Sequence, residues 1–406
     1  MNIAVAQSGG PTCAINASLL GVIKEALRNP EINTIFGAVN GIEGVIDDHL
    51  VNLKSAIRTN EDMELLRQTP STVLGSCRYK LPPVEENSEV YKKITDCFDR
   101  HGIKAFFYIG GNDSMDTVAK LSAYFNKNNI DIKVMGVPKT IDNDLCETDH
   151  TPGFGSAAKY VATSIQEITR DSSVYSIKSV TIVEIMGRHA GWLAASSCTL
   201  HANGEVAPHL IYLPECDFSI EKFLEDIKKK LEVYKAVIVV VSEGIDLSKL
   251  DANLRSGQTD AFGHQFLNGV GKCLEGIVKD AFSCKVRSIE LNVMQRCSSH
   301  ISSRTDIDEA ERIGSYAVKA MMAGHTGKMM AFKRILDMPY TVVIEPVDAT
   351  LVANNEKFFP KEWINNEQNN IKDEALAYFL PLIEGEQVIK MQNGLPVHYK
   401  VGNILD

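Results

Sequence analysis

The stretch AFFYIGGNDSMDTVAKLSAYFNKNNIDIKVMGVP, residues 105–138, decides the fold. It begins with an apolar run at 105–110, continues with a helical pattern over 114–127, and ends with a second apolar run at 133–138. Two strands that are apolar throughout and joined by a helix are typical of a parallel pair with both faces covered. The stretch therefore predicts a strand–helix–strand unit of an α/β fold.

The same alternation extends along the chain on both sides of this unit. Helical patterns occupy residues 14–28 and 155–170. Further apolar runs are NIAVAQ at 2–7, TIFGAV at 34–39, SVTIVEI at 179–185, HLIYLP at 209–214, AVIVVVSEG at 236–244 and VRSIELNVM at 286–294. We therefore expect mostly parallel sheets covered by helices on both faces. The length of 406 residues favours two or three domains of roughly 150 residues each.

Composition and charge exclude several classes of function. The chain is 44% hydrophobic and 23% charged, with a net charge of −10, which disfavours general binding to nucleic acid or anionic membranes. The start MNIAVAQSGG does not resemble a signal peptide, and the run AVIVVV at 236–241 is far shorter than the ~18 residues of a membrane helix. Nine scattered cysteines without metal-binding spacing indicate reduced thiols in a cytoplasmic protein.

Glycines and charged residues follow nearly every apolar run. In order, these segments are SGG at 8–10, GGNDS at 110–114, PKTIDND at 138–144, MGR at 186–188, SEG at 242–244 and QR at 295–296. Ligands of open α/β sheets bind beyond the carboxyl ends of the strands. We therefore expect these segments to line a binding site.

One glycine pair and one basic loop favour a phosphate ligand. Gly9 and Gly10 lie between a strand and a helix, where backbone N–H groups can approach a phosphate closely, although a tight turn explains them equally well. Arg78, with Lys80 nearby, offers donors suited to phosphate oxygens or is part of a solvated loop. The patterns GxGxxG and GxxxxGK[ST] are absent, so neither a dinucleotide fold nor a P-loop is predicted.

Two further segments carry groups for metal binding and proton transfer. Asn112 and Asp113 offer oxygens for Mg²⁺, although Asp113 could instead cap the following helix. Lys139, Asp142 and Asp144 place a cation beside carboxylates that could accept a proton. An Asx-rich turn is the alternative reading of that run.

The second half of the chain supplies cations and hydrogen-bond acceptors. Arg188, Glu243 and Arg296 follow apolar runs, and His300 and Arg304 come shortly afterwards. A phosphosugar requires cations for its phosphate and acceptors for its hydroxyls, and this set offers both. Each residue taken singly is more often a surface charge.

Taken in order, these segments resemble the phosphofructokinase family. The resemblance covers roughly residues 1–340 and is carried most specifically by TIDND at 140–144 and MGRHAG at 186–191. It implies transfer of a phosphoryl group to the 1-hydroxyl of fructose 6-phosphate. It also implies two three-layer, doubly wound α/β lobes with mostly parallel sheets.

The resemblance assigns roles to individual residues. It implies that Asp142 accepts the proton of the 1-hydroxyl and that Gly9, Gly10 and the 110–114 loop contact the phosphoryl donor. Arg296 and Arg304 would serve the site of a neighbouring protomer. The remaining substrate-binding assignments are Arg78, Thr140, Asp144, Met186, Gly187, Arg188 and Glu243.

Two substitutions indicate the donor. ATP-using members usually carry glycine at the positions of Asp113 and Lys139, so this pair resembles the pyrophosphate-dependent branch. Asp113 would lie where the α-phosphate of ATP should be, and like charges ~4 Å apart repel by about 4 kcal/mol at an effective dielectric near 20. Lys139 would supply positive charge to pyrophosphate.

Two other positions depart from the family pattern. Asn112 replaces the aspartate that usually holds the metal, which should weaken direct Mg²⁺ binding. Lys178 lies near the position of an arginine that binds the sugar phosphate in ATP-using members. The prediction therefore keeps Mg²⁺ as cofactor, with Asn112 as its ligand or one shell further out.

We thus predict reversible phosphoryl transfer from pyrophosphate to fructose 6-phosphate by a homo-oligomer, dimer or tetramer. Residues 1–155 would form the donor lobe, 156–305 the sugar-phosphate lobe, and 306–406 a returning segment that packs on both. Asp142, Lys139 and Asp113 form the predicted catalytic set. An ATP-dependent phosphofructokinase and a non-catalytic sugar-phosphate-binding subunit are the alternatives.

Overall fold

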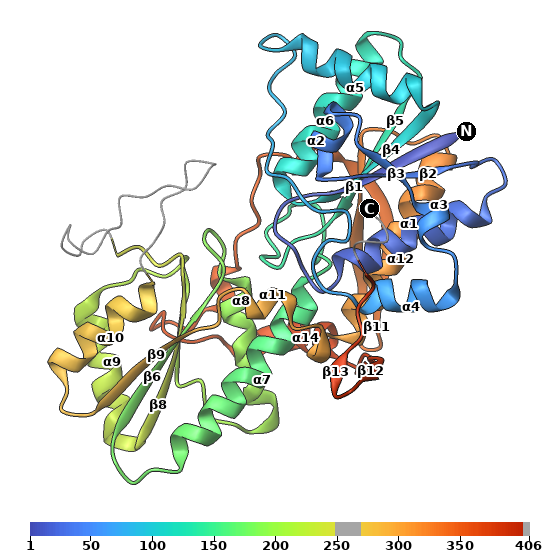
Figure 1. The fold of residues 1–406 in the computed structure, drawn as a ribbon. Coiled ribbons are helices and arrows are strands. Elements are labelled where there is room, and N and C mark those ends of the chain that lie inside the picture. The colour runs from blue at the N-terminus through green and yellow to red at the C-terminus, as the bar shows by residue number, and fades with distance from the viewer. Residues whose placement is uncertain (248–268, 401–406) are drawn as a thin grey trace.

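The computed structural model describes residues 1–247 and 269–400, which form two α/β lobes (Figure 1). The sheet of the first lobe has seven strands in the order β11-β10-β5-β4-β1-β2-β3. Its strands are β1 (Asn2–Gln7), β2 (Ile35–Ala38), β3 (Leu50–Asn52), β4 (Ile103–Gly110), β5 (Lys133–Pro138), β10 (Lys328–Asp337) and β11 (Tyr340–Asp348). The five inner strands run parallel, and β3 and β11 pair antiparallel at the two edges.

Helices cover both faces of the first sheet because its strands are apolar on both sides. Along β4, Phe107 and Ile109 join one core, while Phe106 and Tyr108 join the opposite one. The helices of this lobe are α1 (Ile15–Arg28), α2 (Gly41–Ile46), α3 (Leu53–Ala56), α4 (Asn60–Gln68), α5 (Ser88–Arg100), α6 (Asn112–Lys127) and α12 (Arg304–Met322). Helices α1 and α12 pack on the first core, and α2, α5 and α6 pack on the second.

The second lobe contains a parallel sheet in the order β7-β8-β6-β9. Its strands are β6 (Ser179–Ile185), β7 (Leu210–Tyr212), β8 (Ala236–Ser242) and β9 (Lys285–Glu290). Its helices are α7 (Phe154–Ser173), α8 (Trp192–Ala195), η1 (Ser196–Asn203), α9 (Ile220–Val233) and α10 (Val270–Ala281). This lobe also has helices on both faces, so the predicted fold class is confirmed.

One predicted strand is wrong in its second half. The run at 286–294 was expected to be extended throughout, but β9 ends at Glu290. Asn292 has a left-handed backbone with φ of 41°, and the N–H of Met294 donates to the carbonyl of Leu291. The chain therefore turns into the short helix α11 (Met294–Cys297). This turn brings residues 295 and 296 back towards the space between the lobes.

The last third of the chain contacts both lobes. Strands β10 and β11 extend the first sheet, and Tyr399 is buried in the first core. Phe359, Tyr378 and Phe379 are buried in a core of the second lobe. The remaining elements are η3 (Ser299–Ile301), α13 (Ala349–Val352), η4 (Lys361–Trp363), η5 (Asp373–Ala375), α14 (Leu376–Phe379), η6 (Leu380–Ile383), β12 (Met391–Gln392) and β13 (Leu395–Pro396). Among the described residues, no helix combines the length and the apolar character needed to cross a bilayer.

Candidate active site

A cavity of about 120 Å³ lies where strand ends of the two lobes meet. The first lobe contributes residues that follow β1 and β5, and the second contributes residues that follow β6 and β8. The lining residues are Gly10, Pro11, Thr12, Lys139, Thr140, Ile141, Asp142, Met186, Glu243 and Arg296. Segments that the sequence placed at strand ends therefore come together in space.

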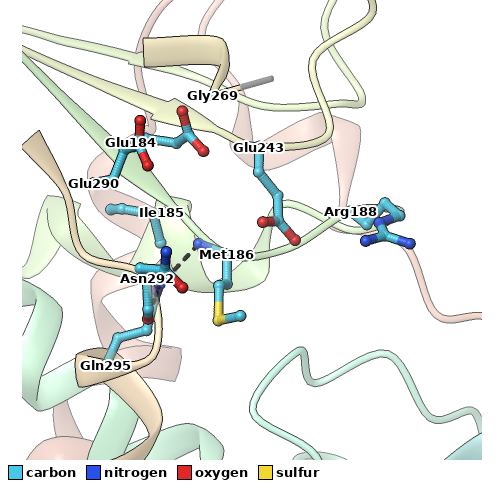
Figure 2. A pocket seen from close by; sticks show the side chains of 9 residues that line it. All are labelled: Glu184, Ile185, Met186, Arg188, Glu243, Gly269, Glu290, Asn292 and Gln295. Atoms are coloured by element: carbon cyan, nitrogen blue, oxygen red, sulfur yellow. Dashed lines mark hydrogen bonds between the residues drawn. The ribbon is translucent and has the colours of Figure 1, made fainter. Parts of the chain in front are cut away.

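A second cavity of about 230 Å³ adjoins the first, because Met186 and Glu243 line both. Figure 2 shows the carboxylates of Glu184, Glu243 and Glu290 and the guanidinium of Arg188 around Met186. The other lining residues are Ile185, Gly269, Asn292 and Gln295. Together the two cavities form a polar space that extends from the first lobe into the second.

Lys139 is a buried cation at the end of β5. Its side chain is 2% exposed, and Nζ donates a hydrogen bond of 2.7 Å to the carbonyl of Gly10. Gly9 has φ of 72°, and a side chain there would start 3.2 Å from this ammonium. Burial lowers the pKa of Lys139 to about 8, against the opposing effect of Asp142 and Asp144. The side chain of Lys139 is therefore charged at neutral pH and loses its proton at only slightly higher pH.

Asp142 is a carboxylate poised for proton transfer. Burial, followed by the charges of Asp144 and Glu243, raises its pKa to about 7, although Lys139 and Arg188 oppose this shift. Its backbone N–H donates to Oγ1 of Thr140 at 3.1 Å, which fixes the turn that presents the carboxylate. A general base works best with a pKa near the operating pH. Asp142 meets that requirement.

The donor side of the site contains Asp113 in the first turn of α6. Its carboxylate is 56% exposed and lies 3.5 Å from Nζ of Lys80. The helix begins at Asn112, so Asp113 is not the N-cap considered from the sequence. The N–H of Lys139 donates to the carbonyl of Gly110, which places the GGNDS segment beside the PKTIDND segment. The exposed Arg78 is close enough to affect the pKa of Lys139 by its charge.

Asn112 was predicted to bind a metal ion, but its side chain is hydrogen-bonded to other parts of the chain. Its Oδ1 accepts a hydrogen bond of 2.6 Å from the backbone N–H of Asn354, and its Nδ2 donates to the carbonyls of Val352 and Asn355 at 3.3 and 2.6 Å. Both ends of the amide are therefore engaged by the segment that follows α13. This geometry does not fit Asn112 as a direct ligand of Mg²⁺.

On the second lobe, hydrogen bonds to backbone N–H groups shape the larger cavity. Gln295 accepts from the N–H of Met186 at 3.2 Å, and Glu243 accepts from the N–H of Gly187 at 3.4 Å. Burial raises the pKa of Glu243, although Gly187 and Arg188 oppose the shift. Arg188 lines the larger cavity. These side chains offer both acceptors and a cation to a ligand.

The remaining predicted cations lie at different places. Arg296 lines the smaller cavity, and a side chain at Gly10 would start 3.4 Å from its Nη1. Arg304 begins α12, is 62% exposed and faces Asp308 at 3.5 Å, and it lines neither cavity. Lys178 immediately precedes β6 and so lies at the opposite end of that strand from the site. Of these three, Arg296 is the one at the site of this chain.

Two carboxylates of the larger cavity, Glu184 and Glu290, were not predicted from the sequence. Glu184 interrupts the apolar strand β6 near its end, and Glu290 ends β9 beside it. Burial raises the pKa of Glu184 to about 7, and its Oε2 accepts from the N–H of Gly271 at 2.6 Å. A single charged residue inside an apolar run was the signal that could have identified Glu184.

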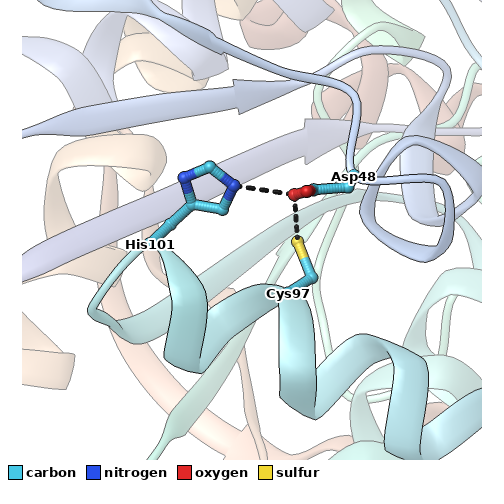
Figure 3. Close-up of side chains that lie close together, drawn as sticks. All are labelled: Asp48, Cys97 and His101. Carbon is cyan, nitrogen blue, oxygen red and sulfur yellow. Dashed lines mark hydrogen bonds and ion pairs between the residues drawn. The ribbon is translucent and has the colours of Figure 1, made fainter.

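A separate cluster joins Asp48, Cys97 and His101 on the first lobe (Figure 3). Asp48 Oδ1 lies 2.7 Å from Nε2 of His101 and accepts from the thiol of Cys97 at 3.4 Å. Arg100 pairs with the other oxygen of Asp48, and burial raises the pKa of Cys97 to about 12. A guanidinium and a protonated thiol both oppose a metal cation. Hydrogen bonding accounts for this cluster.

Known proteins resemble this chain in sequence and in fold. The sequence matches the family model described as “Phosphofructokinase” over residues 2–321. The chain belongs to the phosphofructokinase family. The match ends inside α12, so strands β10 and β11 and everything after them lie beyond it.

Similar proteins of the phosphofructokinase family cover nearly the whole chain. “Pyrophosphate--fructose 6-phosphate 1-phosphotransferase” of Halomonas elongata is 38% identical over 398 residues, 97% of this chain and 94% of that protein. The protein of the same name from Methylococcus capsulatus is 37% identical over 406 residues, 99% of this chain and 96% of that one. The crystal structure titled pyrophosphate-dependent phosphofructokinase from Marinobacter aquaeolei has a TM-score of 0.88 and 36% identity, covering 100% of this chain and 97% of that one.

Proposed function

We propose that this protein transfers a phosphoryl group reversibly from pyrophosphate to the 1-hydroxyl of fructose 6-phosphate, giving fructose 1,6-bisphosphate and phosphate. The observation that carries the proposal is the buried ammonium of Lys139, set between the glycine pair and the carboxylate of Asp142. A donor without a nucleoside has only its phosphates to bind, and a buried cation binds them more strongly than an exposed one. The carboxylate of Asp113, at the start of α6, would repel the α-phosphate of ATP and so disfavour ATP as the donor.

Each group of the site has a step in this reaction. Asp142 takes the proton of the 1-hydroxyl as that oxygen attacks the phosphorus atom. Lys139 stabilises the charge of the moving phosphoryl group, and the leaving phosphate departs towards the glycine pair and Arg78. Thr140, Met186, Gly187, Arg188, Glu243 and Arg296 hold the sugar phosphate. Since a phosphoanhydride bond is exchanged for a phosphate ester and phosphate, the reaction can run in both directions.

Members of the phosphofructokinase family generally use Mg²⁺. The donor loop does not form a protein-held site for it, because the amide of Asn112 is engaged by residues 352–355 and Asp113 faces an ammonium. We therefore assign no step to a metal held by the protein. We keep Mg²⁺ in the proposal as a cofactor, and we do not assign Asn112 as one of its ligands.

Initial rates with different donors test the proposal directly. At fixed fructose 6-phosphate and Mg²⁺, pyrophosphate should support turnover, and kcat/KM for ATP and ADP should be at least about 100-fold lower. Equal or better use of ATP would identify the ATP-dependent alternative. No turnover with any donor, from purified protein alone, would identify a non-catalytic subunit.

The pKa values of the site predict a bell-shaped pH dependence of kcat/KM. Activity should fall below about pH 7, where Asp142 becomes protonated and can no longer accept a proton. It should also fall above about pH 8, where Lys139 loses its charge. The control is Lys139→Arg, whose guanidinium does not titrate in this range, so that only the acid limb should remain. An unchanged alkaline limb in that variant would mean that substrate ionisation causes it.

We further propose that the protein acts in the cytoplasm as a homo-oligomer, dimer or tetramer. Arg304 and Lys178 are predicted sugar-phosphate cations, but neither lies at the site of its own chain. Beside Lys178, the side chains of Val174, Tyr175 and Ile177 are exposed, as is common at subunit contacts. A monomeric mass by sedimentation at assay concentrations would contradict the proposal.

A further inference from the structure

Residues 352–359, which we call the tie segment, contact three loops of the site. They begin at the last residue of α13 and lie beyond residues 2–321, the part of the chain that matches the family model. The three loops are the GGNDS loop at 110–114, the catalytic loop at 139–150 and the MGRHAGW loop at 186–192. Each loop comes from a different strand end, so a single segment that binds all three can set their relative positions.

The first contact of the tie segment is with the GGNDS loop. The side chain of Asn112 makes the three hydrogen bonds to residues 352, 354 and 355 described above. In addition, Nδ2 of Asn354 donates to Oδ1 of Asp116 at 3.1 Å. An amide suits this place because it offers both a donor and an acceptor to the backbone. A carboxylate at position 112 could accept from Asn354 but could not donate to the two carbonyls.

The second contact is with the catalytic loop. The N–H of Lys357 donates to the carbonyl of Asp144 at 2.8 Å, and Glu356 forms an antiparallel bridge with Leu145. The Lys357 ammonium then donates to the carbonyls of Thr148 and Asp149 at 3.0 and 2.8 Å. The tie segment therefore holds the part of the catalytic loop that directly follows Asp142, residues 144–149.

The third contact is with the MGRHAGW loop. Nε1 of Trp192 donates to the carbonyl of Lys357 at 2.9 Å, and the Lys357 ammonium lies 4.9 Å from the centre of the Trp192 ring. Two backbone N–H groups, of Phe359 and Gly191, donate to the same oxygen of Glu215 at 2.8 and 3.0 Å. The end of the MGRHAGW loop is thus fixed to the tie segment directly by the Trp192 side chain and indirectly through Glu215.

We propose that the tie segment holds the donor, catalytic and sugar loops in register, with Lys357 and Asn112 as positioning residues for phosphoryl transfer. Asn112 is then an anchor for residues 352–355, in a position where the family usually has a metal ligand. The inference rests on the proposed function for its activity assays. The hydrogen-exchange measurement described below does not depend on it.

The charges around Lys357 explain why its removal should affect the reaction and not only stability. Asp149 and Asp144 attract its ammonium, Arg334 repels it, and Cys146 lies nearby. Asp144 in turn lies close to Glu356, His189 and Asp142. Loss of the Lys357 charge should therefore raise the pKa of Asp144. An Asp144 that is protonated more often raises the pKa of Asp142 less, so Asp142 should titrate at lower pH.

Lys357→Met tests the positioning role, because methionine keeps the contact with Trp192 and removes both hydrogen bonds. We expect kcat to fall by about 10- to 100-fold, the KM of both substrates to change less than about threefold, and the acid limb to move to lower pH. Lys357→Arg should restore the acid limb and part of kcat. Lys361→Met, at an exposed lysine just after the tie segment, is the matched control and should behave as wild type.

Hydrogen–deuterium exchange separates the outcomes. In Lys357→Met, amides of residues 139–150 and 186–192 should exchange faster, while those of β1 and β4 should not change. If the exchange and the pH profile both match wild type, the tie segment does not position the loops. If the wild type has no activity with pyrophosphate, the function proposal fails, and the exchange measurement still decides the inference.

Asn112→Asp distinguishes an anchor from a metal ligand. As an anchor, Asn112 should lose two donated hydrogen bonds on substitution, so that exchange of residues 352–356 accelerates and kcat falls by about 10-fold, with no gain in Mg²⁺ affinity. As a ligand, the new carboxylate should tighten Mg²⁺ activation and leave exchange unchanged. Asn126→Asp, at an exposed position of the same helix, controls for added charge.

Discussion

Replacing Asp142 with asparagine should lower kcat by a factor of about 10²–10⁴, the range that a general base contributes. The substitution keeps the size of the side chain and the hydrogen bond from the backbone of residue 142 to Thr140. It removes the proton acceptor and nothing else from the smaller cavity. The KM for fructose 6-phosphate should therefore change little, and the acid limb of the pH profile should disappear.

Asp144→Asn is the informative comparison for that variant. Asp144 raises the pKa of Asp142 by its charge, so its neutralisation should lower this pKa and extend activity to more acidic pH. Steady-state rates between pH 5 and 9 measure both effects. Asp142 would not be the base if Asp142→Asn kept more than a tenth of the wild-type kcat, or if Asp144→Asn lost more activity than Asp142→Asn.

The placement of the site was predictable because it depends on a local rule. Apolar strands alternate with helices, and the carboxyl ends of parallel strands share one edge of a sheet. Residues 9, 139, 188 and 243 follow such strands, so their convergence required only the sequence pattern. Strands β10 and β11 were not predicted, because their pairing joins residues 328–348 to β5 and depends on tertiary contacts.

The contacts that the sequence could not predict are those between distant residues. Asn112 meets a segment about 240 positions later, and nothing in the GGNDS motif indicates that the amide turns away from the donor. Lys357 lies in an Asn/Glu-rich stretch, residues 353–370, whose composition is typical of the surface, yet its ammonium donates to two backbone carbonyls of the catalytic loop. A sequence motif indicates a role from the residue types alone. The roles of Asn112 and Lys357 depend instead on the residues that contact them.

Replacing Lys139 with glycine should lower kcat/KM for pyrophosphate by about 10³-fold, since removal of one preorganised charge or donor costs about 10²–10³ in rate and the binding of a tetra-anion also suffers. The variant removes the buried ammonium that contacts the Gly10 carbonyl and leaves Asp142 without the cation that most strongly lowers its pKa. Lys80→Gly is the matched control, because Lys80 is the exposed lysine that faces Asp113. It should lower kcat/KM for pyrophosphate by less than about 10-fold. A similar loss in both variants would show that general charge, and not the buried site, binds the donor.

Asp113→Gly should produce the opposite change, a gain of ATP use by about 10-fold, and Asp113→Asn should produce most of the same gain if charge is the cause. The gain is modest because this carboxylate is half exposed and lies 3.5 Å from Lys80, so solvent and a cation both screen it. The double variant Asp113→Gly, Lys139→Gly should then use ATP at a measurable rate and pyrophosphate hardly at all. If it loses pyrophosphate activity and gains none with ATP, Asp113 does not exclude the nucleotide, and donor choice depends on Lys139 alone.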